Sequence, residues 1–287
     1  PMDAIIINDG TTTSSYVPFY GYYANTGANS QFIIPEKEIA AIQWDSITKL
    51  TFFASTTTAT WEGAQFDVYV AETNDTVLSA MVAWTDMHKV VNSKHLELAN
   101  KQMEVTLDKP FQYQGGNLLI GFKQTVMGTG VSCSWYGKSG VTGNAMYQYS
   151  SNAASKSNFN PKVRIDYVHG EMPTCFVVKN ITVSDITPSS AVLNWTPGEE
   201  GQTAWQIVYS ADPAFDLASI APEDIHDVMA LPYALAELAT DTLYNVYVRA
   251  NCSEEGNEDY SMWSELFTFH TASSCQTPDN VKADSIS

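Results

Sequence analysis

The sequence predicts an all-β protein made of two successive β-sandwiches, and three observations point to this fold class. Aromatic residues make up 12% of the chain while charged residues make up only 16%, a composition that favours strands. Runs with an apolar residue at every second position recur along the chain, and clusters of Gly, Asn, Asp and Thr separate them. A length of 287 residues leaves room for two domains with a core each.

Residues 1–168 form the first predicted domain. Pro35, followed by Glu36 and Glu38, predicts one short helical turn, because proline suits the first helical position and carboxylates suit the amino-terminal end of a helix. The strongly apolar run at 47–54 predicts a central strand covered on both faces. Four alternating runs predict half-buried strands: Phe66, Val68 and Val70; Met103, Val105 and Leu107; Leu118, Ile120 and Phe122; Val163, Ile165 and Tyr167. These short strands and their turns favour a β-sandwich of the jelly-roll type.

Residues 174–272 form the second predicted domain, after a linker at 169–173 that contains Gly170 and Pro173. Its strands are shorter and more closely spaced than those of the first domain. The alternating runs are Ala191, Leu193 and Trp195; Trp205, Ile207 and Tyr209; Tyr244, Val246, Val248 and Ala250; Phe267 and Phe269. A domain of about 100 residues with one early Trp, a second in the next strand and a late Tyr favours an immunoglobulin-like sandwich.

Residues 275–287 resemble the start of the second domain at an offset of 100 positions. Cys275 corresponds to Cys175, and Asn280 corresponds to Asn180. We therefore expect residues 275–287 to begin a further, truncated module of the same kind. The chain would then be a segment of a longer protein built from serial modules.

The segment at 238–244 reads Leu-Ala-Thr-Asp-Thr-Leu-Tyr and is followed by Asn-Val-Tyr-Val-Arg-Ala. This fits the pattern Leu-x-Pro-x-Thr-x-Tyr-x-Val-x-Val-x-Ala, with Thr240 where proline is usual, so the second domain resembles a fibronectin type III module. The resemblance makes Trp195 the core tryptophan and Tyr244 the residue of the tyrosine corner. It also makes residues 275–287 the start of a second such module.

The same resemblance implies a disulfide between Cys175 and Cys252. In a fibronectin-like sandwich the first strand begins at the end where the sixth stops, and the two cysteines flank these points. The closed loop would stabilise the fold by about 4.5 kcal/mol in the chain-entropy model. Cys275 would pair within the next module, and Cys133 would remain a buried thiol. A zinc site is the competing interpretation, but no Cys-x₂-Cys spacing supports it.

The first domain contains Ser-Tyr-Val-Pro-Phe-Tyr-Gly-Tyr-Tyr at 15–23, Ser-Gln-Phe-Ile at 30–33 and Pro-Phe-Gln-Tyr at 110–113. It ends with Phe-Asn-Pro-Lys-Val-Arg-Ile-Asp-Tyr at 159–167. On these segments it resembles a jelly-roll module of Bacteroidetes surface proteins, akin to the adhesin modules of gingipain-type proteins. Such modules, placed before fibronectin-like ones, imply surface attachment or carbohydrate contact and do not imply a reaction.

The charge of the chain disfavours anionic partners. The net charge is −18, and residues 169–287 carry 3 basic and 18 acidic side chains against 11 and 14 in residues 1–168. Such a surface repels phosphate backbones and anionic lipids, so we expect no nucleic-acid partner. No apolar run approaches the roughly 20 residues of a membrane helix, so we expect no direct membrane insertion of this segment.

The motifs that usually mark catalysis do not occur. Gly137, Lys138 and Ser139 resemble part of a phosphate loop, but the glycine required five residues earlier is replaced by Ser132. No Gly-x-Ser-x-Gly or His-Glu-x-x-His pattern is present. The acidic loop at 254–259 lacks the ordered spacing of a calcium loop. We therefore expect no catalytic residue, no cofactor and no metal site.

Aromatic residues remain as candidates for ligand binding, because Trp and Tyr rings stack on the C–H faces of sugars while polar neighbours bind hydroxyls. Trp61 next to Glu62 is expected to be exposed after a Thr-rich loop. The complete set of candidate residues is Trp61, Glu62, Trp84, Asp86, Trp135 and Tyr136. The tyrosine-rich segment at 16–23 is another possibility. The alternative is that all these rings belong to the core or to strand edges.

These observations predict a non-catalytic binding protein that is secreted or displayed on a cell surface. The jelly-roll domain would contact a glycan or a host or matrix protein, and the fibronectin-like modules would act as spacers. A second hypothesis is an ancillary segment of a large exported hydrolase, a glycosidase or protease, whose catalytic domain lies outside these residues. An enzyme within residues 1–168 and a purely structural stalk are further alternatives.

Overall fold

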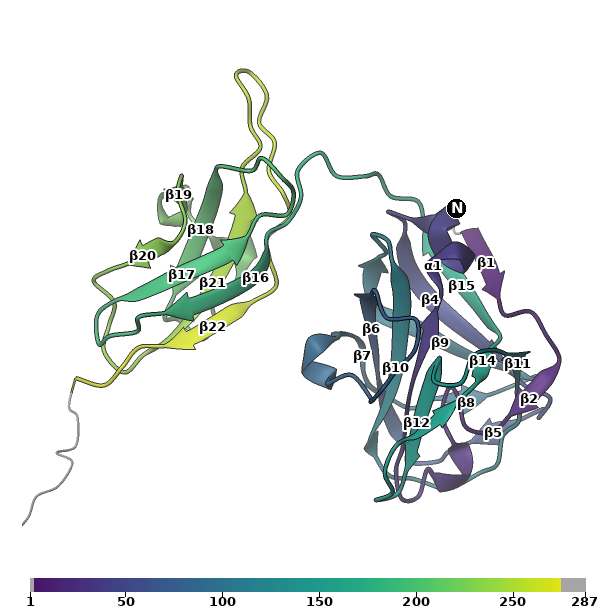
Figure 1. Cartoon of the computed structure of the whole chain (residues 1–287). Helices are drawn as coiled ribbons and strands as arrows, with labels where there is room; N and C mark the ends of the chain where they lie inside the picture. The colour runs from purple at the N-terminus through teal and green to yellow at the C-terminus, as the bar shows by residue number, and fades with distance from the viewer. Residues whose placement is uncertain (1–2, 275–287) are drawn as a thin grey trace, which may run out of the picture. The chain divides into compact units, whose positions relative to one another are not determined.

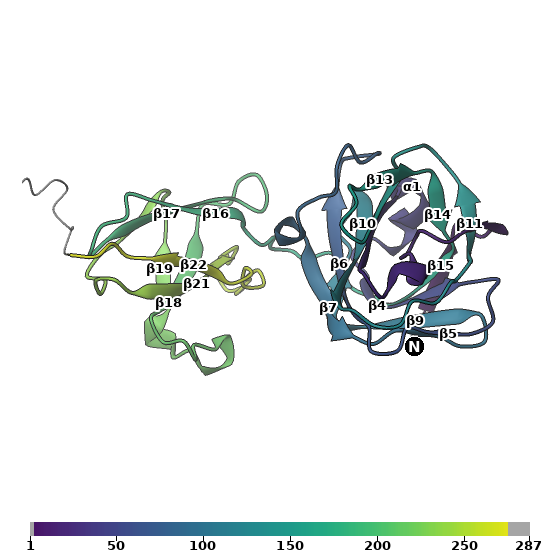
Figure 2. The same cartoon turned by 90° about the horizontal axis from the view of Figure 1, so that it is seen from below.

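The computed structural model describes residues 3–274, and the chain divides into one compact unit ending at Met172 and another beginning at Pro173. Figures 1 and 2 show the two units from directions at right angles. The described residues are nearly all strands and turns, which confirms the predicted all-β class. The expected start of a further module at 275–287 lies outside the described residues.

Two antiparallel sheets form the body of the first unit, with β6 and β10 on one side and β15 on the other in Figure 2. One sheet has the order β1-β15-β4-β9 and comprises β1 (Asp3–Ile7), β4 (Ser46–Phe53), β9 (Gln102–Gln112) and β15 (Val163–Val168). The other has the order β13-β12-β3-β10-β6-β7 and comprises β3 (Ala28–Ile34), β6 (Gln65–Thr73), β7 (His88–Lys94), β10 (Asn117–Val126), β12 (Ala145–Tyr149) and β13 (Ser155–Ser157).

Smaller elements complete the first unit. A three-stranded sheet contains β2 (Thr12–Ser14), β11 (Trp135–Ser139) and β14 (Phe159–Pro161), and a two-stranded one contains β5 (Ala59–Thr60) and β8 (Glu97–Leu98). The helical turns are η1 (Gly21–Tyr23), α1 (Glu36–Ile39), η2 (Ala40–Ile42) and η3 (Trp84–Asp86). The turn predicted after Pro35 is thus confirmed as α1, with Pro35 as its N-cap residue.

The chain crosses repeatedly between the two main sheets, and β6 and β7 are consecutive strands of the same sheet, which is the jelly-roll connectivity that the sequence predicts. Strands β1, β4, β9 and β15 lie in one sheet, and β3, β6, β7 and β10 lie in the other. All neighbours within the two sheets pair antiparallel. Eight strands connected in this way form two interlocked Greek keys.

The core of the first unit lies between the sheets and is made by the predicted alternating runs. Phe66, Val68 and Val70 are buried together with the inward residues of β9, β10 and β15. Phe52 of one sheet meets Phe122 of the other edge to face, with 5.4 Å between ring centroids. β4 is central in its sheet, as predicted. Its outer face carries Lys49, which pairs with Glu104 and meets solvent, so the predicted burial of both faces is wrong.

A loop covers the outer face of the six-stranded sheet and forms a second small core. Gln31 is fully buried on β3, and its side-chain amide both donates to the carbonyl of Val82 and accepts from the Val82 N–H, at 2.8 and 2.7 Å. The ring of Trp84 lies over Gly121, where a Cβ atom would come within 2.6 Å of the indole. The loop is therefore fixed to the sheet by packing and by hydrogen bonds.

His169 binds two carboxylates of the first unit, with Nε2 at 2.7 Å from Asp3 Oδ2 and Nδ1 at 3.4 Å from Asp45 Oδ1. The hydrogen bond to Asp3, followed by that to Asp45, raises the imidazole pKa above its usual 6.5. Because the folded pKa is the higher one, the stabilisation is complete below pH 6.5 and is lost as the pH rises through the folded pKa. We expect an NMR titration to give His169 a pKa above 6.5 and Asp3→Asn to lower it. An unchanged titration in this variant would contradict the contact.

The second unit is an immunoglobulin-like sandwich of two antiparallel sheets, as predicted. One has the order β16-β17-β20 and comprises β16 (Lys179–Ser184), β17 (Ala191–Thr196) and β20 (Tyr233–Leu235). The other has the order β19-β18-β21-β22 and comprises β18 (Trp205–Ser210), β19 (His226–Val228), β21 (Leu243–Ala250) and β22 (Phe267–His270). Two helical turns, η4 (Leu217–Ser219) and η5 (Pro222–Asp224), lie between β18 and β19.

The residues assigned to the core of the second unit are buried there. Trp195 of one sheet and Trp205 of the other meet edge to face, with 5.9 Å between ring centroids. Tyr244 acts as a tyrosine corner, because its hydroxyl accepts a hydrogen bond of 2.8 Å from the Ala239 N–H. The positions of Trp195 and Tyr244 confirm the roles that the resemblance implied.

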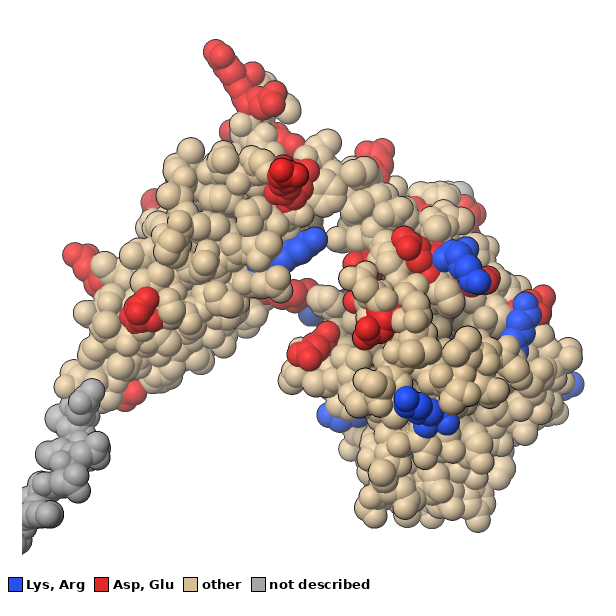
Figure 3. All heavy atoms as spheres, viewed as in Figure 1, with Lys and Arg blue, Asp and Glu red and all other residues tan. Residues whose placement is uncertain are grey.

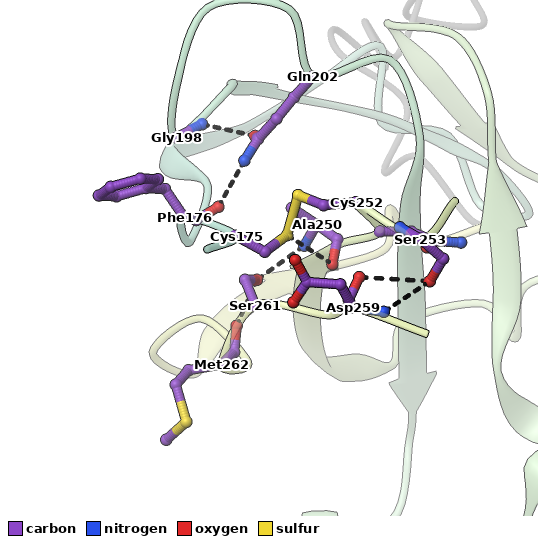
Figure 4. The surroundings of a disulfide bond; sticks show 11 residues. Cys175, Phe176, Gly198, Gln202, Ala250, Cys252, Ser253, Asp259, Ser261 and Met262 are labelled. Carbon is purple, nitrogen blue, oxygen red and sulfur yellow. Dashed lines mark hydrogen bonds between the residues drawn. A yellow bond between two sulfur atoms is a disulfide. The ribbon is translucent and has the colours of Figure 1, made fainter. Parts of the chain in front are cut away.

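Cys175 and Cys252 form the predicted disulfide (Figure 4). The bond joins the segment before β16 to the end of β21, two points 77 residues apart in sequence. Neighbouring hydrogen bonds hold both sides: Gln202 binds the Phe176 carbonyl, and the Ser261 hydroxyl accepts from the Ala250 N–H. Cys133 is a free, buried thiol whose pKa rises to about 12 through burial.

Candidate functional site

Two of the predicted binding tryptophans lie inside the first unit. Trp61 and Trp135 are both 0% exposed, so the expected exposure of Trp61 is wrong. The indole N–H of Trp61 donates to the Val131 carbonyl at 2.9 Å, and that of Trp135 donates to the Phe19 carbonyl at 3.2 Å. With its one polar group satisfied internally, each large ring is stabilised by burial. Neither ring presents a face on which a ligand stacks.

The other predicted site residues do not form one surface with these tryptophans. Trp84 is half-buried and packs on Tyr69, with 5.0 Å between ring centroids, in the small core outside the six-stranded sheet. Glu62 and Asp86 are exposed, and Tyr136 is half-buried. Trp61 and Trp135 lie 6.0 Å apart in the main core. The structure therefore places Trp61 and Trp135 in the core, while Trp84 packs against the outer face of a sheet.

A surface group of six tyrosines, here called the tyrosine patch, forms the largest aromatic cluster at the surface of the described residues. It comprises Tyr16, Tyr20, Tyr22, Tyr23, Tyr147 and Tyr149. Two segments supply these rings. Residues 16–23 enter the first unit through buried Val17 and Phe19 and end in η1. β12 pairs with β3 and presents its two tyrosines, which are two positions apart, on one face.

The rings of the patch form two parallel pairs joined by a fifth tyrosine. Tyr16 stacks on Tyr147 with centroids 4.3 Å apart and planes inclined by 12°, and Tyr23 stacks on Tyr149 at 4.4 Å and 24°. Tyr20 meets Tyr16 edge-on at 4.8 Å and Tyr23 at 5.0 Å. These contacts hold the rings in fixed orientations, so little side-chain entropy remains to be lost when a ligand binds.

The patch is partly exposed and uncharged. Tyr22 is 54% exposed and Tyr16 is 37% exposed, and the other rings are half-buried. Burial raises the pKa of the Tyr20 and Tyr147 hydroxyls above 10.0, further from physiological pH. In Figure 3 the lower end of the first unit, where Figure 1 draws the purple turn η1, shows a surface without Lys, Arg, Asp or Glu. The tyrosine patch therefore presents aromatic rings and hydroxyl groups without a strong electrostatic field.

A polar cleft of about 370 Å³ adjoins the patch and shares two of its rings. Tyr16 and Tyr147 line it together with seven Thr, Ser and Asn side chains, Phe159 and Lys156. The polar side chains come from β2, β11, β13 and the turns beside them. A ligand that stacks on the patch would thus find hydrogen-bond donors and acceptors within reach of its edge.

The arrangement of the cleft suits the binding of a ligand with polar groups. Most of the residues that line the cleft are Thr, Ser and Asn, and none of the described lining residues is a nucleophile paired to a base. Within residues 3–274, no group of three His, Cys, Asp or Glu side chains is placed to hold a metal ion. No helix in this part of the chain has the length and apolarity to cross a bilayer.

The tyrosine-rich segment at 16–23, which the sequence predicts as a possible binding site, supplies four of the six rings of the patch. The sequence analysis does not predict the other two, Tyr147 and Tyr149. The alternation Tyr-Gln-Tyr at 147–149 is a strand signal that places both rings on one face, and it could have pointed to them. The connection between the two segments depends on the pairing of β12 with β3.

Comparison with known families identifies part of the second unit. The fibronectin type III domain model matches residues 176–266. The resemblance of the second domain to fibronectin type III modules is therefore confirmed. No curated protein shows significant similarity to the chain. Fibronectin type III domains are typically binding or spacer modules, and such a domain with a disulfide fits an extracellular protein.

Solved structures with similarity to the chain include β-sandwich and fibronectin type III domains. A computationally redesigned β-sandwich protein is 21% identical, with 36% of this chain and 97% of that chain covered and a TM-score of 0.27. A fibronectin type III domain of human collagen XX is 23% identical, with 36% and 99% covered and a TM-score of 0.24. The sixth such domain of the human fibronectin type III domain containing protein 3 is 16% identical, with 39% and 98% covered and a TM-score of 0.27.

Proposed function

We propose that the chain belongs to a secreted or surface-displayed binding protein whose first unit holds a carbohydrate on the tyrosine patch. The observation that carries the proposal is a set of fixed, partly exposed tyrosine rings beside a cleft lined by hydroxyl groups. A sugar ring has C–H faces that pack on aromatic rings and hydroxyl groups that require hydrogen-bond partners. The patch supplies the aromatic rings, and the adjoining cleft supplies the hydrogen-bond partners.

A carbohydrate suits the surface better than a protein partner does. Binding centres for proteins are enriched in Trp, Arg and Met as well as Tyr, and they bury an apolar core. The patch contains only tyrosines, and polar side chains surround it: Thr26 bonds Ser150, and Asn29 bonds Gln148. The resemblance of the first domain to adhesin modules of Bacteroidetes surface proteins also supports carbohydrate contact.

The second unit would act as a stiff spacer in this protein. Its disulfide and its fibronectin type III match suit an extracellular location, because disulfides persist in oxidising compartments. The same arrangement would serve a free adhesin or an ancillary segment of an exported hydrolase. In both cases the first unit binds and does not catalyse.

A glycan array probed with the whole chain, followed by alanine variants of two patch tyrosines, tests the proposal. We expect Tyr16→Ala and Tyr22→Ala each to weaken binding of an array-selected oligosaccharide at least fivefold, about 1 kcal/mol, because each removes a stacking face. Tyr22 is the most exposed ring of the patch, so its removal is expected to leave the fold intact. Isothermal titration calorimetry gives the affinities.

Tyr167→Ala is the matched control, because Tyr167 is a half-buried tyrosine on β15 in the opposite sheet. This variant is expected to keep the affinity of the unaltered chain. Unchanged binding by both patch variants would exclude the patch as the site. Failure of the chain to retain any oligosaccharide on the array would contradict the proposal.

A further inference from the structure

The stacked ring pairs of the tyrosine patch are arranged in a row along β12. Tyr147 and Tyr149 are two positions apart on this strand, and their rings lie parallel within 8°, with centroids 6.3 Å apart. A strand rises by roughly 6–7 Å over two residues, so the backbone sets this spacing. Tyr16, from the segment at 16–23, stacks on Tyr147. Tyr23 stacks on Tyr149 in the same way.

Tyr22 adds a third ring position beside the second pair. Its ring meets that of Tyr23 edge-on, with 5.0 Å between centroids, and it is 54% exposed. Tyr20 lies between the pairs, because it meets both Tyr16 and Tyr23 edge-on at 4.8 and 5.0 Å. The aromatic surface therefore continues from the first pair through the second pair to Tyr22.

The polar cleft adjoins the first pair. Tyr16 and Tyr147 are among the described residues that line it, whereas the other four tyrosines of the patch are not. Ser157 also lines the cleft and lies on the same face as Tyr147, because its partner Ala145 is two positions before Tyr147 on β12. Ser14 lines the cleft too, and its hydroxyl accepts from the Tyr16 N–H at 3.3 Å. Hydroxyl groups are thus concentrated at one end of the row.

A chain of sugar rings fits a row of this kind better than a single sugar does. Consecutive rings of a linear oligosaccharide follow one another at about one ring length, which is comparable to the spacing of the stacked pairs. Each ring offers C–H faces for stacking and hydroxyl groups for the cleft. The surface around the patch in Figure 3 is uncharged, so a charged group placed there would lose hydration without gaining an opposite charge.

We propose that the ligand of the first unit is a neutral linear oligosaccharide, about three sugar rings long where it contacts the protein, that lies along the tyrosine patch with one end at the cleft. This inference rests on the proposed carbohydrate-binding function and specifies the length, charge and placement of the sugar. One ring stacks on the pair formed by Tyr16 and Tyr147 and binds the hydroxyl groups of the cleft. The next ring stacks on the second pair, and the third reaches Tyr22.

Saccharides of increasing length test this inference with the whole chain. The probes are cello-, manno- and chito-oligosaccharides of one to four sugar rings, together with shortened forms of any oligosaccharide that the glycan array selects. We expect the affinity, measured by isothermal titration calorimetry, to rise about fivefold to tenfold with each added ring up to the third, the range of an aromatic contact. A fourth ring should add about twofold at most, because it extends past Tyr22 into solvent.

Tyr22→Ala distinguishes the two ends of the row. This variant is expected to lower the affinity for the three-ring saccharide about fivefold to tenfold and to leave that for the shorter ones unchanged. Tyr16→Ala should weaken all lengths alike, because every bound chain uses the pair beside the cleft. Tyr22→Phe keeps the ring face and should retain the gain from the third ring. Tyr167→Ala, in the opposite sheet, is the control and should leave all affinities unchanged.

Failure of this inference differs from failure of the proposed function. Equal affinities for one, two and three rings, with Tyr16→Ala still weakening each, would show that the patch binds a single sugar and that the extended ligand is wrong. A loss in Tyr22→Ala that is the same at every length would contradict the placement of Tyr22 at the far end. Stronger binding of a charged saccharide than of its neutral counterpart would contradict the neutral ligand. Absence of binding to every saccharide of the series and of the array would overturn both proposals.

Discussion

Replacing Trp135 with alanine is expected to lower the free energy of unfolding of the first unit by about 3–5 kcal/mol, the usual cost of deleting a fully buried tryptophan ring. Trp135 is 0% exposed and packs on Phe19 and Trp61, with ring centroids 5.6 and 6.0 Å away. The variant leaves a cavity and also leaves the Phe19 carbonyl without its indole donor. Urea unfolding of the whole chain, followed by tryptophan fluorescence and circular dichroism, measures the loss.

Trp84→Ala provides the control for this experiment. Trp84 is half-buried and covers the outer face of a sheet, so its removal exposes surface and leaves no enclosed cavity in the main core. We expect it to cost clearly less than Trp135→Ala. If Trp135→Ala proved as stable as the unaltered chain but lost affinity for an oligosaccharide, the assignment of this tryptophan to packing would be wrong.

Removal of the disulfide is expected to destabilise the second unit by about 2–5 kcal/mol. The bond joins Cys175 to Cys252, which are 77 positions apart in sequence. Without the bond, the unfolded chain gains conformational entropy, and the folded state becomes less stable relative to it. The double substitution of both cysteines by serine, compared with the oxidised chain by calorimetry, measures the effect. The transition of the second unit should move to lower temperature, while that of the first unit should stay in place.

Cys133→Ser separates the effect of the disulfide from that of losing a thiol. Cys133 is a free, buried cysteine of the first unit, so this variant is expected to alter only the transition of that unit. Addition of a reductant should reproduce the double substitution in the second unit. A second unit whose unfolding temperature is the same with and without reductant would show that the bond contributes little to its stability.

Local sequence patterns predict the strands and their faces because a strand alternates its side chains strictly. Phe66, Val68 and Val70 face the core as their spacing indicates, and the same holds for Val246 and Val248 in the second unit. The disulfide was predictable for a related reason. Once the order of strands in the second unit is assumed, the ends of β16 and β21 meet, and the flanking cysteines must lie close together.

The exposure of single aromatic rings was not predictable in this way. Trp61 is preceded by a Thr-rich turn and followed by exposed Glu62, so its neighbours in sequence suggested a surface position. Its burial depends on the Val131 carbonyl, 70 residues away, and that of Trp135 depends on the Phe19 carbonyl, 116 residues away. No local pattern contains these partners.

The sequence by itself determined the all-β class and the alternating strand faces, because both follow from strand periodicity. The tyrosine corner and the pairing of Cys175 with Cys252 followed from the resemblance of the second domain to a fibronectin type III module. Only the tertiary structure decided which rings reach solvent. It buries Trp61 and Trp135 and gathers the tyrosines of residues 16–23 with Tyr147 and Tyr149. The reason is that ring exposure depends on contacts between segments that are distant in sequence, and these contacts exist only after the two sheets have paired and packed.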